Sequence, residues 1–211
     1  MIRKHIVIAS TLATAVVALV GCASSGTSQN LQTLADQTFK ASFLPGPGQD
    51  LTRLEQDQTQ IDCSTSRANP SEALAKTISA REAKTIVYPE DGKLVGDWKA
   101  GAKIFNDGFA YRIGSFIPSN HEVVRGGNCY ACHQGEAKEA AYGNLGPSLL
   151  HWGKIRGQSE PNIKYTYEKI YNAKAFNACS AMPRLGHKIL SPKQVSDLVA
   201  YLVSPDSPIN K

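Results

Sequence analysis

The sequence is poor in several features that would point to common protein classes. It has only two methionines and two tryptophans in 211 residues, and its formal net charge is only +5. A charge excess of this size is too small to indicate a nucleic-acid-binding protein. Only one apolar run approaches membrane-spanning length, which excludes a protein with several transmembrane segments. A hydrophobic share of 42% argues against disorder and predicts one folded domain with an appendage.

The apolar run occupies residues 6–21 and follows the basic segment Arg3-Lys4-His5, which is the layout of a secretory signal. It ends at Leu19-Val20-Gly21-Cys22, which resembles the lipobox of bacterial lipoproteins. On that interpretation Cys22 becomes the acylated first residue of the mature chain. Two alternatives remain open, ordinary cleavage nearby (for instance after Ala23) and an uncleaved anchor helix. Export places the protein in the periplasm, either free or anchored to the membrane through acylated Cys22.

The chain divides into three segments. We expect a signal peptide over residues 1–21, a tether with an N-terminal extension over 22–60, and a folded domain with a packed N-terminal helix over 61–211. Residues 23–30 are small and polar, as in a flexible linker. Residues 45–48 read Pro-Gly-Pro-Gly and break any regular element.

Two helices are predicted in the middle of the chain. Asn69 followed by Pro70 is typical of a helix start and leads into a helix over residues 71–85. A second helix begins at Asp97 and carries an apolar stripe of Trp98, Ala102, Phe105 and Phe109.

The C-terminal helix has the clearest sequence signals. Ser191 can cap it, Pro192 occupies the first turn and Gln194 completes a capping box. Its apolar face has the spacing i, i+3, i+4, i+7: Val195, Leu198, Val199 and Leu202. No stretch of the sequence alternates apolar and polar residues as a strand does. The fold class is therefore predicted to be mainly α.

The chemistry-bearing motif is Cys129-Tyr130-Ala131-Cys132-His133, which has the C-x-x-C-H pattern of c-type haem attachment. The two thiols of Cys129 and Cys132 can each form a thioether with a haem vinyl group, and His133 is the proximal iron ligand. A structural zinc site would need a second Cys or His pair at finger spacing, and a thioredoxin-like dithiol would need a βαβ context. Neither is found, so we predict one covalently bound haem c.

The sixth iron ligand is predicted by elimination. Apart from the initiator, Met182 is the only methionine, and Pro183 stiffens its loop. A thioether opposite histidine raises the reduction potential, as an electron acceptor requires. The competing ligands are His121, His151 and His187, and the alternative role for Met182 is core packing.

Two cysteines, Cys63 and Cys179, remain outside the haem motif and Cys22. In an oxidising compartment we expect a disulfide between them, with two buried free thiols as the alternative. Cys179 lies three residues before Met182, so the bridge would clamp the ligand loop to the N-terminal extension.

The order of these motifs resembles that of class I cytochromes c: a helix with Phe105, the haem motif, Gly146-Pro147, Met182-Pro183 and an amphipathic C-terminal helix. The resemblance implies that the carbonyl of Pro147 accepts the imidazole proton. It also implies a class I cytochrome c fold with an N-terminal extension. Within that family, four segments resemble the SoxX subunits of SoxXA sulfur-oxidation complexes: residues 127–133, 143–149, 182–186 and 199–208. This similarity covers residues 60–211.

The SoxX resemblance implies a thiosulfate-oxidising system. The partner would be a SoxA-like dihaem or mono-haem cytochrome that carries the active-site haem, and the complex would join thiosulfate to the cysteine of a sulfur-carrier protein. This chain would have no catalytic residue and would pass electrons to a small cytochrome c. Two other functions remain open, a free-standing periplasmic electron shuttle to a respiratory oxidase and a gas-binding haem sensor, the latter opposed by Met182.

Four basic residues near the motif in sequence offer a way to steer acidic partners toward the haem: Arg125, Lys138, Lys154 and Arg156. The alternative is that they are an ordinary solvated surface.

Overall fold

The C-terminal helix forms as the sequence predicts and becomes the centre of the fold. Helix α8 (Pro192–Val203) begins with a capping box, in which the Gln194 amide donates to Ser191 Oγ at 3.3 Å. The Gln194 side chain in turn accepts from the Ser191 amide at 2.8 Å. All four residues of the predicted apolar face are buried, and so are Ala200 and Tyr201 outside it. Because α8 is buried well beyond one face, it packs against several other helices.

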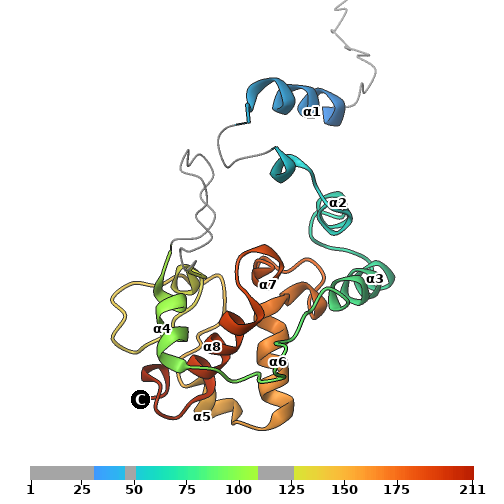
Figure 1. Ribbon diagram of the computed structural model, residues 1–211. Coiled ribbons are helices and arrows are strands. Elements are labelled where there is room, and N and C mark those ends of the chain that lie inside the picture. Colours follow the sequence, from blue (N-terminus) through green and yellow to red (C-terminus); the bar gives the residue numbers. More distant parts are fainter. Residues whose placement is uncertain (1–30, 46–50, 109–125) are drawn as a thin grey trace, which may run out of the picture. The chain divides into compact units, whose positions relative to one another are not determined.

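The computed structural model describes residues 31–45, 51–108 and 126–211 (Figure 1). The predicted signal peptide and Cys22 lie outside these residues. The described part is helical and contains no strand, which confirms the predicted fold class. Its α-helices are α1 (Leu31–Ser42), α2 (Gln58–Thr65), α3 (Glu72–Ala83), α4 (Trp98–Asn106), α5 (Trp152–Arg156), α6 (Glu160–Tyr171), α7 (Leu185–Lys188) and α8. Its 3-10 helices are η1 (Thr52–Leu54), η2 (Cys129–Ala131), η3 (Ala173–Ala175) and η4 (Pro208–Asn210).

The chain separates into two compact units, Met1–Leu44 and Pro45–Lys211. In the first unit the structure describes α1, where the rings of Phe39 and Phe43 stack with centroids 5.7 Å apart. The second unit contains all the other described helices, and its helix α2 spans the predicted boundary between residues 60 and 61. Within the described residues, none of the helices combines the length and hydropathy needed to cross a bilayer.

Helix α4 packs directly on α8, and a glycine makes the close approach possible (Figure 1). A β-carbon on Gly101 would lie 2.9 Å from Cβ of Tyr201 and closer still to the carbonyl of Asp197. Next to this contact, the rings of Phe105 and Tyr201 pack with centroids 5.1 Å apart. The Asp97 amide at the start of α4 also donates to the Asp197 carboxylate at 2.8 Å. Packing and hydrogen bonding therefore fix the same pair of helices.

The boundaries of α4 differ in part from the prediction. Asp97 caps the helix as expected, accepting from the Lys99 amide at 2.8 Å. The helix ends at Asn106, and Phe109, the last member of the predicted stripe, lies outside the described residues. Gly101, Ile104 and Phe105 form its buried face, whereas Trp98 and Ala102 are half-buried.

Helix α3 starts later than the sequence predicted. Ser71, and not Asn69, is its N-cap, because Ser71 Oγ accepts from the Leu74 amide at 3.3 Å. The helix ends at Ala83, two residues short of the predicted end at Thr85. In the middle of α3, Ser79 Oγ donates to the carbonyl of Lys174 at 3.2 Å, and this hydrogen bond attaches α3 to η3.

Helix α2 was not anticipated from the sequence pattern. Its N-terminus carries a second capping box, in which Asp57 accepts from the Gln60 amide at 2.9 Å and the Gln60 side chain accepts from the Asp57 amide at 2.8 Å. Most of its side chains are exposed, but Thr59 is 2% exposed and faces α3. Helix α2 has no long apolar face. It is stabilised by its capping box and by the buried contact of Thr59 with α3.

The contact between α4 and α8 leads to a stability prediction. We expect Gly101→Ala to lower the free energy of unfolding by about 2 kcal/mol or more, because the added methyl group meets backbone that cannot rotate away. Gly108→Ala is the control, since its nearest new neighbour would be 3.6 Å away, and it should change stability by less than about 0.5 kcal/mol. Thermal unfolding followed by circular dichroism measures both, and equal melting temperatures for the two variants would contradict this packing.

Candidate haem site

The haem motif folds into a tight turn that gathers its three functional side chains. Residues Cys129–Ala131 form η2, and the preceding Asn128 has φ 48° in the left-handed region. The amides of Cys132 and His133 both donate to the carbonyl of Cys129, at 3.0 and 2.9 Å. Cys129 packs against the hydrophobic core, whereas Cys132 and His133 are half-buried. The structure therefore brings two thiols and one imidazole together on a single turn.

The orientation of His133 is set by a hydrogen bond from Nδ1 to the carbonyl oxygen of Pro147 at 2.7 Å. A carbonyl can only accept, so Nδ1 carries the proton and Nε2 keeps its lone pair for a metal. This is the role that the resemblance implied for Pro147. The hydrogen bond also increases the basicity of the imidazole, which strengthens it as an iron ligand.

The segment around Pro147 lies against the ring of His133 because it contains a glycine. A β-carbon on Gly146 would be 2.6 Å from Nε2 of His133 and nearer still to its Cε1 and Nδ1. The Gly146 amide donates to the carbonyl of Cys132 at 2.8 Å, which ties this segment to the haem motif. Only a residue without a side chain fits between this segment and the ring of His133. The ring is therefore held in one orientation, with Nε2 available to an iron. The residues present thus fit a haem bound by His133.

The first thiol of the motif lies in an apolar environment. Burial, together with the neighbouring Cys132, raises the pKa of the free Cys129 thiol to about 12. A thioether at this position carries no charge, so it is buried here without the cost of desolvating an ion.

Met182 is half-buried and packs against the same core as Cys129. Its amide donates to Ser180 Oγ at 3.2 Å, which orders the backbone before Pro183. The assignment of Met182 as the axial ligand stays a prediction.

The competing histidines are distributed differently. His121 lies outside the described residues, and nothing is described of the His187 side chain. His151 precedes α5 with φ 60°, and its amide donates to the carbonyl of Ile209 at 2.8 Å. Among the described residues its buried Nδ1 has no hydrogen-bond partner. The backbone at His151 therefore joins the start of α5 to the C-terminal segment.

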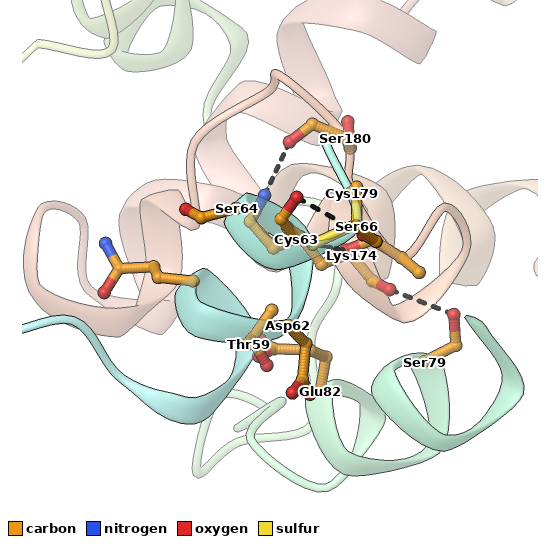
Figure 2. The surroundings of a disulfide bond; sticks show 12 residues. Thr59, Asp62, Cys63, Ser64, Ser66, Ser79, Glu82, Lys174, Cys179 and Ser180 are labelled. Carbon is orange, nitrogen blue, oxygen red and sulfur yellow. Dashed lines mark hydrogen bonds between the residues drawn. A yellow bond between two sulfur atoms is a disulfide. The ribbon is translucent and has the colours of Figure 1, made fainter. Parts of the chain in front are cut away.

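The structure contains a disulfide between Cys63 and Cys179, with Cα atoms 5.6 Å apart. It joins α2 to the segment that leads into Met182 (Figure 2). Close to the bridge, Lys174 Nζ donates to the carbonyl of Ser180 at 2.6 Å. The free cysteines of the described residues are Cys129 and Cys132. Both thiols outside the haem motif in this part of the chain are thus paired with each other.

Sequence reasoning missed a polar cluster on the other side of Met182. Arg184 Nη1 lies 3.3 Å from Oε1 of Glu82, which is 2% exposed, and Arg184 Nη2 pairs with Asp57. Glu82 and Arg184 are 102 residues apart, and no motif or periodicity links residues at such a separation. Only the burial of a charged residue in α3 signals the contact, and burial is a tertiary property.

Within the described residues, two of the four basic residues named above have side-chain partners. Lys138 pairs with the buried Glu136 at 3.1 Å, and the Arg156 guanidinium stacks over the Trp152 ring at 5.1 Å. Lys154 is exposed, and Arg125 lies outside the described residues. Electrostatic steering stays a prediction.

Comparison with known proteins agrees with this site. Residues 99–205 match the family described as Cytochrome c. The chain is also similar to an uncharacterized lipoprotein of Aquifex aeolicus (strain VF5), with 39% identity over 167 residues, 74% of this chain and 73% of that protein. The matched family region includes the haem motif, Pro147 and Met182.

The contact between Gly146 and His133 leads to a prediction. We expect Gly146→Ala to displace the imidazole, because the new methyl group would overlap the ring of His133. The reduced and oxidised absorption spectra of the matured protein should then report a weakened histidine–iron bond, with a lower yield of haem-loaded protein. Leu145→Ala, at a neighbouring residue that is 71% exposed, is the control and should leave the spectra unchanged. Identical spectra for both variants would contradict the proposed proximal geometry.

Proposed function

Because the chain belongs to the cytochrome c family and is an electron-transfer haem protein, we propose that it is the electron-accepting subunit of a SoxXA-like thiosulfate-oxidising complex. In this role the chain binds one haem c and has no catalytic residue of its own. The partner is a SoxA-like cytochrome subunit.

The residues of this chain suit an electron relay. When bound, haem c supplies reversible one-electron chemistry. Cys129 and Cys132 hold the group covalently, and His133 presents Nε2 because Nδ1 donates to Pro147. With Met182 as the second protein ligand beside His133, the chain would supply both protein ligands of the iron and would leave no position for a substrate. The chain therefore moves electrons without binding the sulfur compound.

The observation that carries the proposal is the pairing of Cys63 with Cys179. Oxidative coupling of thiosulfate to a carrier cysteine forms a sulfur–sulfur bond, releases the thiol proton to solvent and yields two electrons. Cys63 and Cys179 are joined to each other and offer no thiolate for such a step. The nucleophile would belong to the sulfur-carrier protein and the active-site haem to the SoxA-like partner. This chain takes the two electrons one at a time and passes them to a small cytochrome c.

The four segments that resemble SoxX provide the specific support. The last of them, residues 199–208, runs from α8 into η4, where the chain returns to α5. There Asn210 Nδ2 donates to the carbonyls of Leu202 and Ser204, each at 2.9 Å, and its Oδ1 accepts from the Gly153 amide at 2.9 Å. This closing segment is thus an integrated part of the domain, as a family-specific element would be.

Purification with a partner tests the proposal. The tagged chain is co-expressed with an exported SoxA-like haem protein in a host that matures c-type cytochromes. We expect a stable complex whose haems are reduced when thiosulfate and the carrier protein are added together. A Cys129→Ala/Cys132→Ala variant is the control, since it cannot hold haem and should block electron transfer to the small cytochrome c. A chain that stays monomeric and reduces a respiratory oxidase directly would instead support the free-standing shuttle and overturn the proposal.

We further propose that the protein is a periplasmic lipoprotein anchored through Cys22. The relative from Aquifex aeolicus carries the name lipoprotein, which supports this assignment. In this chain residues 23–30 provide a short polar tether between the anchor and α1.

Fractionation tests the anchor. In a host with lipoprotein processing, the wild-type chain should sediment with membranes, and Cys22→Ala should move it to the soluble fraction, because acyl chains supply the binding energy. Ser25→Ala in the same polar segment is the control and should stay with the membranes. A soluble wild-type chain whose intact mass lacks acyl groups would contradict lipidation.

A further inference from the structure

The segment that contains Met182 is attached to α2 and α3 at both of its ends. On one side, Cys179 is bonded to Cys63 of α2, three residues before Met182. On the other side, Arg184 follows Met182 by two residues and contacts Glu82 of α3 and Asp57 at the start of α2. The Arg184 side chain is 18% exposed, so it points into the protein and not into solvent. From Cys179 to Arg184, the two attached residues, this segment is only six residues long.

Glu82 is a buried carboxylate with a complete set of partners. Oε2 accepts from Asn172 Nδ2 at 2.7 Å, and Oε1 accepts from Thr59 Oγ1 and faces Arg184. Burial raises the pKa of Glu82, but the hydrogen bonds from Asn172 and Thr59 and the Arg184 charge outweigh it and hold the pKa below its ordinary value. Glu82 is therefore charged at neutral pH.

A buried carboxylate of this kind is sensitive to the position of its cation. Loss of one partner from a buried ion pair leaves an uncompensated charge, which is far more costly than loss of an exposed pair. Movement of Arg184 away from Glu82 is therefore unfavourable. Because Pro183 is the only residue between Met182 and Arg184, backbone movement at Met182 also moves Arg184.

We propose that Glu82 is a positioning residue for Met182, and that it acts through Arg184 to keep the thioether at the iron. The inference rests on the proposed ligation by Met182. Together with the disulfide, the Glu82–Arg184 pair closes both ends of the ligand loop. Helices α2 and α3, which precede the matched cytochrome c region, thereby control the strength of a haem ligand.

Three variants in the haem-loaded protein test the proposal. Glu82→Gln keeps the shape of the side chain and removes the charge, and Arg184→Ala removes the cation. Asp57→Asn removes the charge at the exposed partner of Arg184. Asparagine can still cap α2, so this variant should fold. It therefore tests the proposal even if a substitution at the buried Glu82 prevents folding. Asp62→Asn is the matched control, because Asp62 pairs with Arg81 at 2.7 Å between the same two helices and not with the ligand loop.

The main measurement is competition by imidazole for the ferric iron, well below the unfolding temperature. We expect Glu82→Gln and Arg184→Ala to raise the apparent affinity for imidazole by about tenfold or more, since a loosely held thioether is displaced more easily. Asp57→Asn should act in the same direction with a smaller effect. The far-red sulfur-to-iron absorption band should weaken in the same order, and the reduction potential should fall. Asp62→Asn should lower only the melting temperature.

Met182→Ala separates failure of this inference from failure of the proposed ligation. If wild type shows the far-red band and Met182→Ala abolishes it, while the three variants bind imidazole as wild type does, the positioning role is overturned and the ligation stands. If wild type has no such band and Met182→Ala alters neither spectrum nor potential, the ligation fails and the positioning role fails with it. An equal rise in imidazole affinity for Asp62→Asn would also overturn the inference, because it would indicate general loosening.

Discussion

The hydrogen bond between His133 Nδ1 and the carbonyl of Pro147 is the interaction on which the haem site depends. It assigns the imidazole proton to one nitrogen and leaves the other free for iron. The bond requires the backbone at Gly146 to lie against the ring, a place where no side chain fits. The amide of Gly146 in turn binds the carbonyl of Cys132, so the motif and the segment 143–149 support each other. The proximal side of the site is therefore built within about twenty residues of chain.

The side of the site that contains Met182 is built on a different principle. Its loop is held by partners from helices α2 and α3, through the disulfide to Cys63 and the buried pair with Glu82. Each contact closes a loop of more than a hundred residues, so its formation costs the chain entropy. A disulfide and a desolvated ion pair both resist small displacements, in contrast to exposed ion pairs, which contribute little. Helices α2 and α3 are thus part of the proposed electron-transfer site.

The difference between the local contacts of His133 and the long-range contacts of the Met182 loop is consistent with the proposed electron-transfer role. The contacts of His133 are local in sequence, whereas those of the loop around Met182 come from helices α2 and α3. Ligation of the iron by Met182 would exclude external ligands and raise the reduction potential, as the proposed electron-accepting role requires.

The sequence alone determined the chemistry and the most regular elements. C-x-x-C-H specifies haem attachment because the spacing itself is the chemical requirement, and the signals at Ser191, Pro192 and Gln194 define α8 because capping is local. Local signals were less exact for α3, where Ser71 took the place of Asn69 as the cap, and they missed α2, which has no apolar face. The contact of α4 with α8 through Gly101 and the partnership of Glu82 with Arg184 were decided only by the tertiary structure. Burial and long-range contact arise when distant segments pack together, and no local pattern of residues encodes which segments meet.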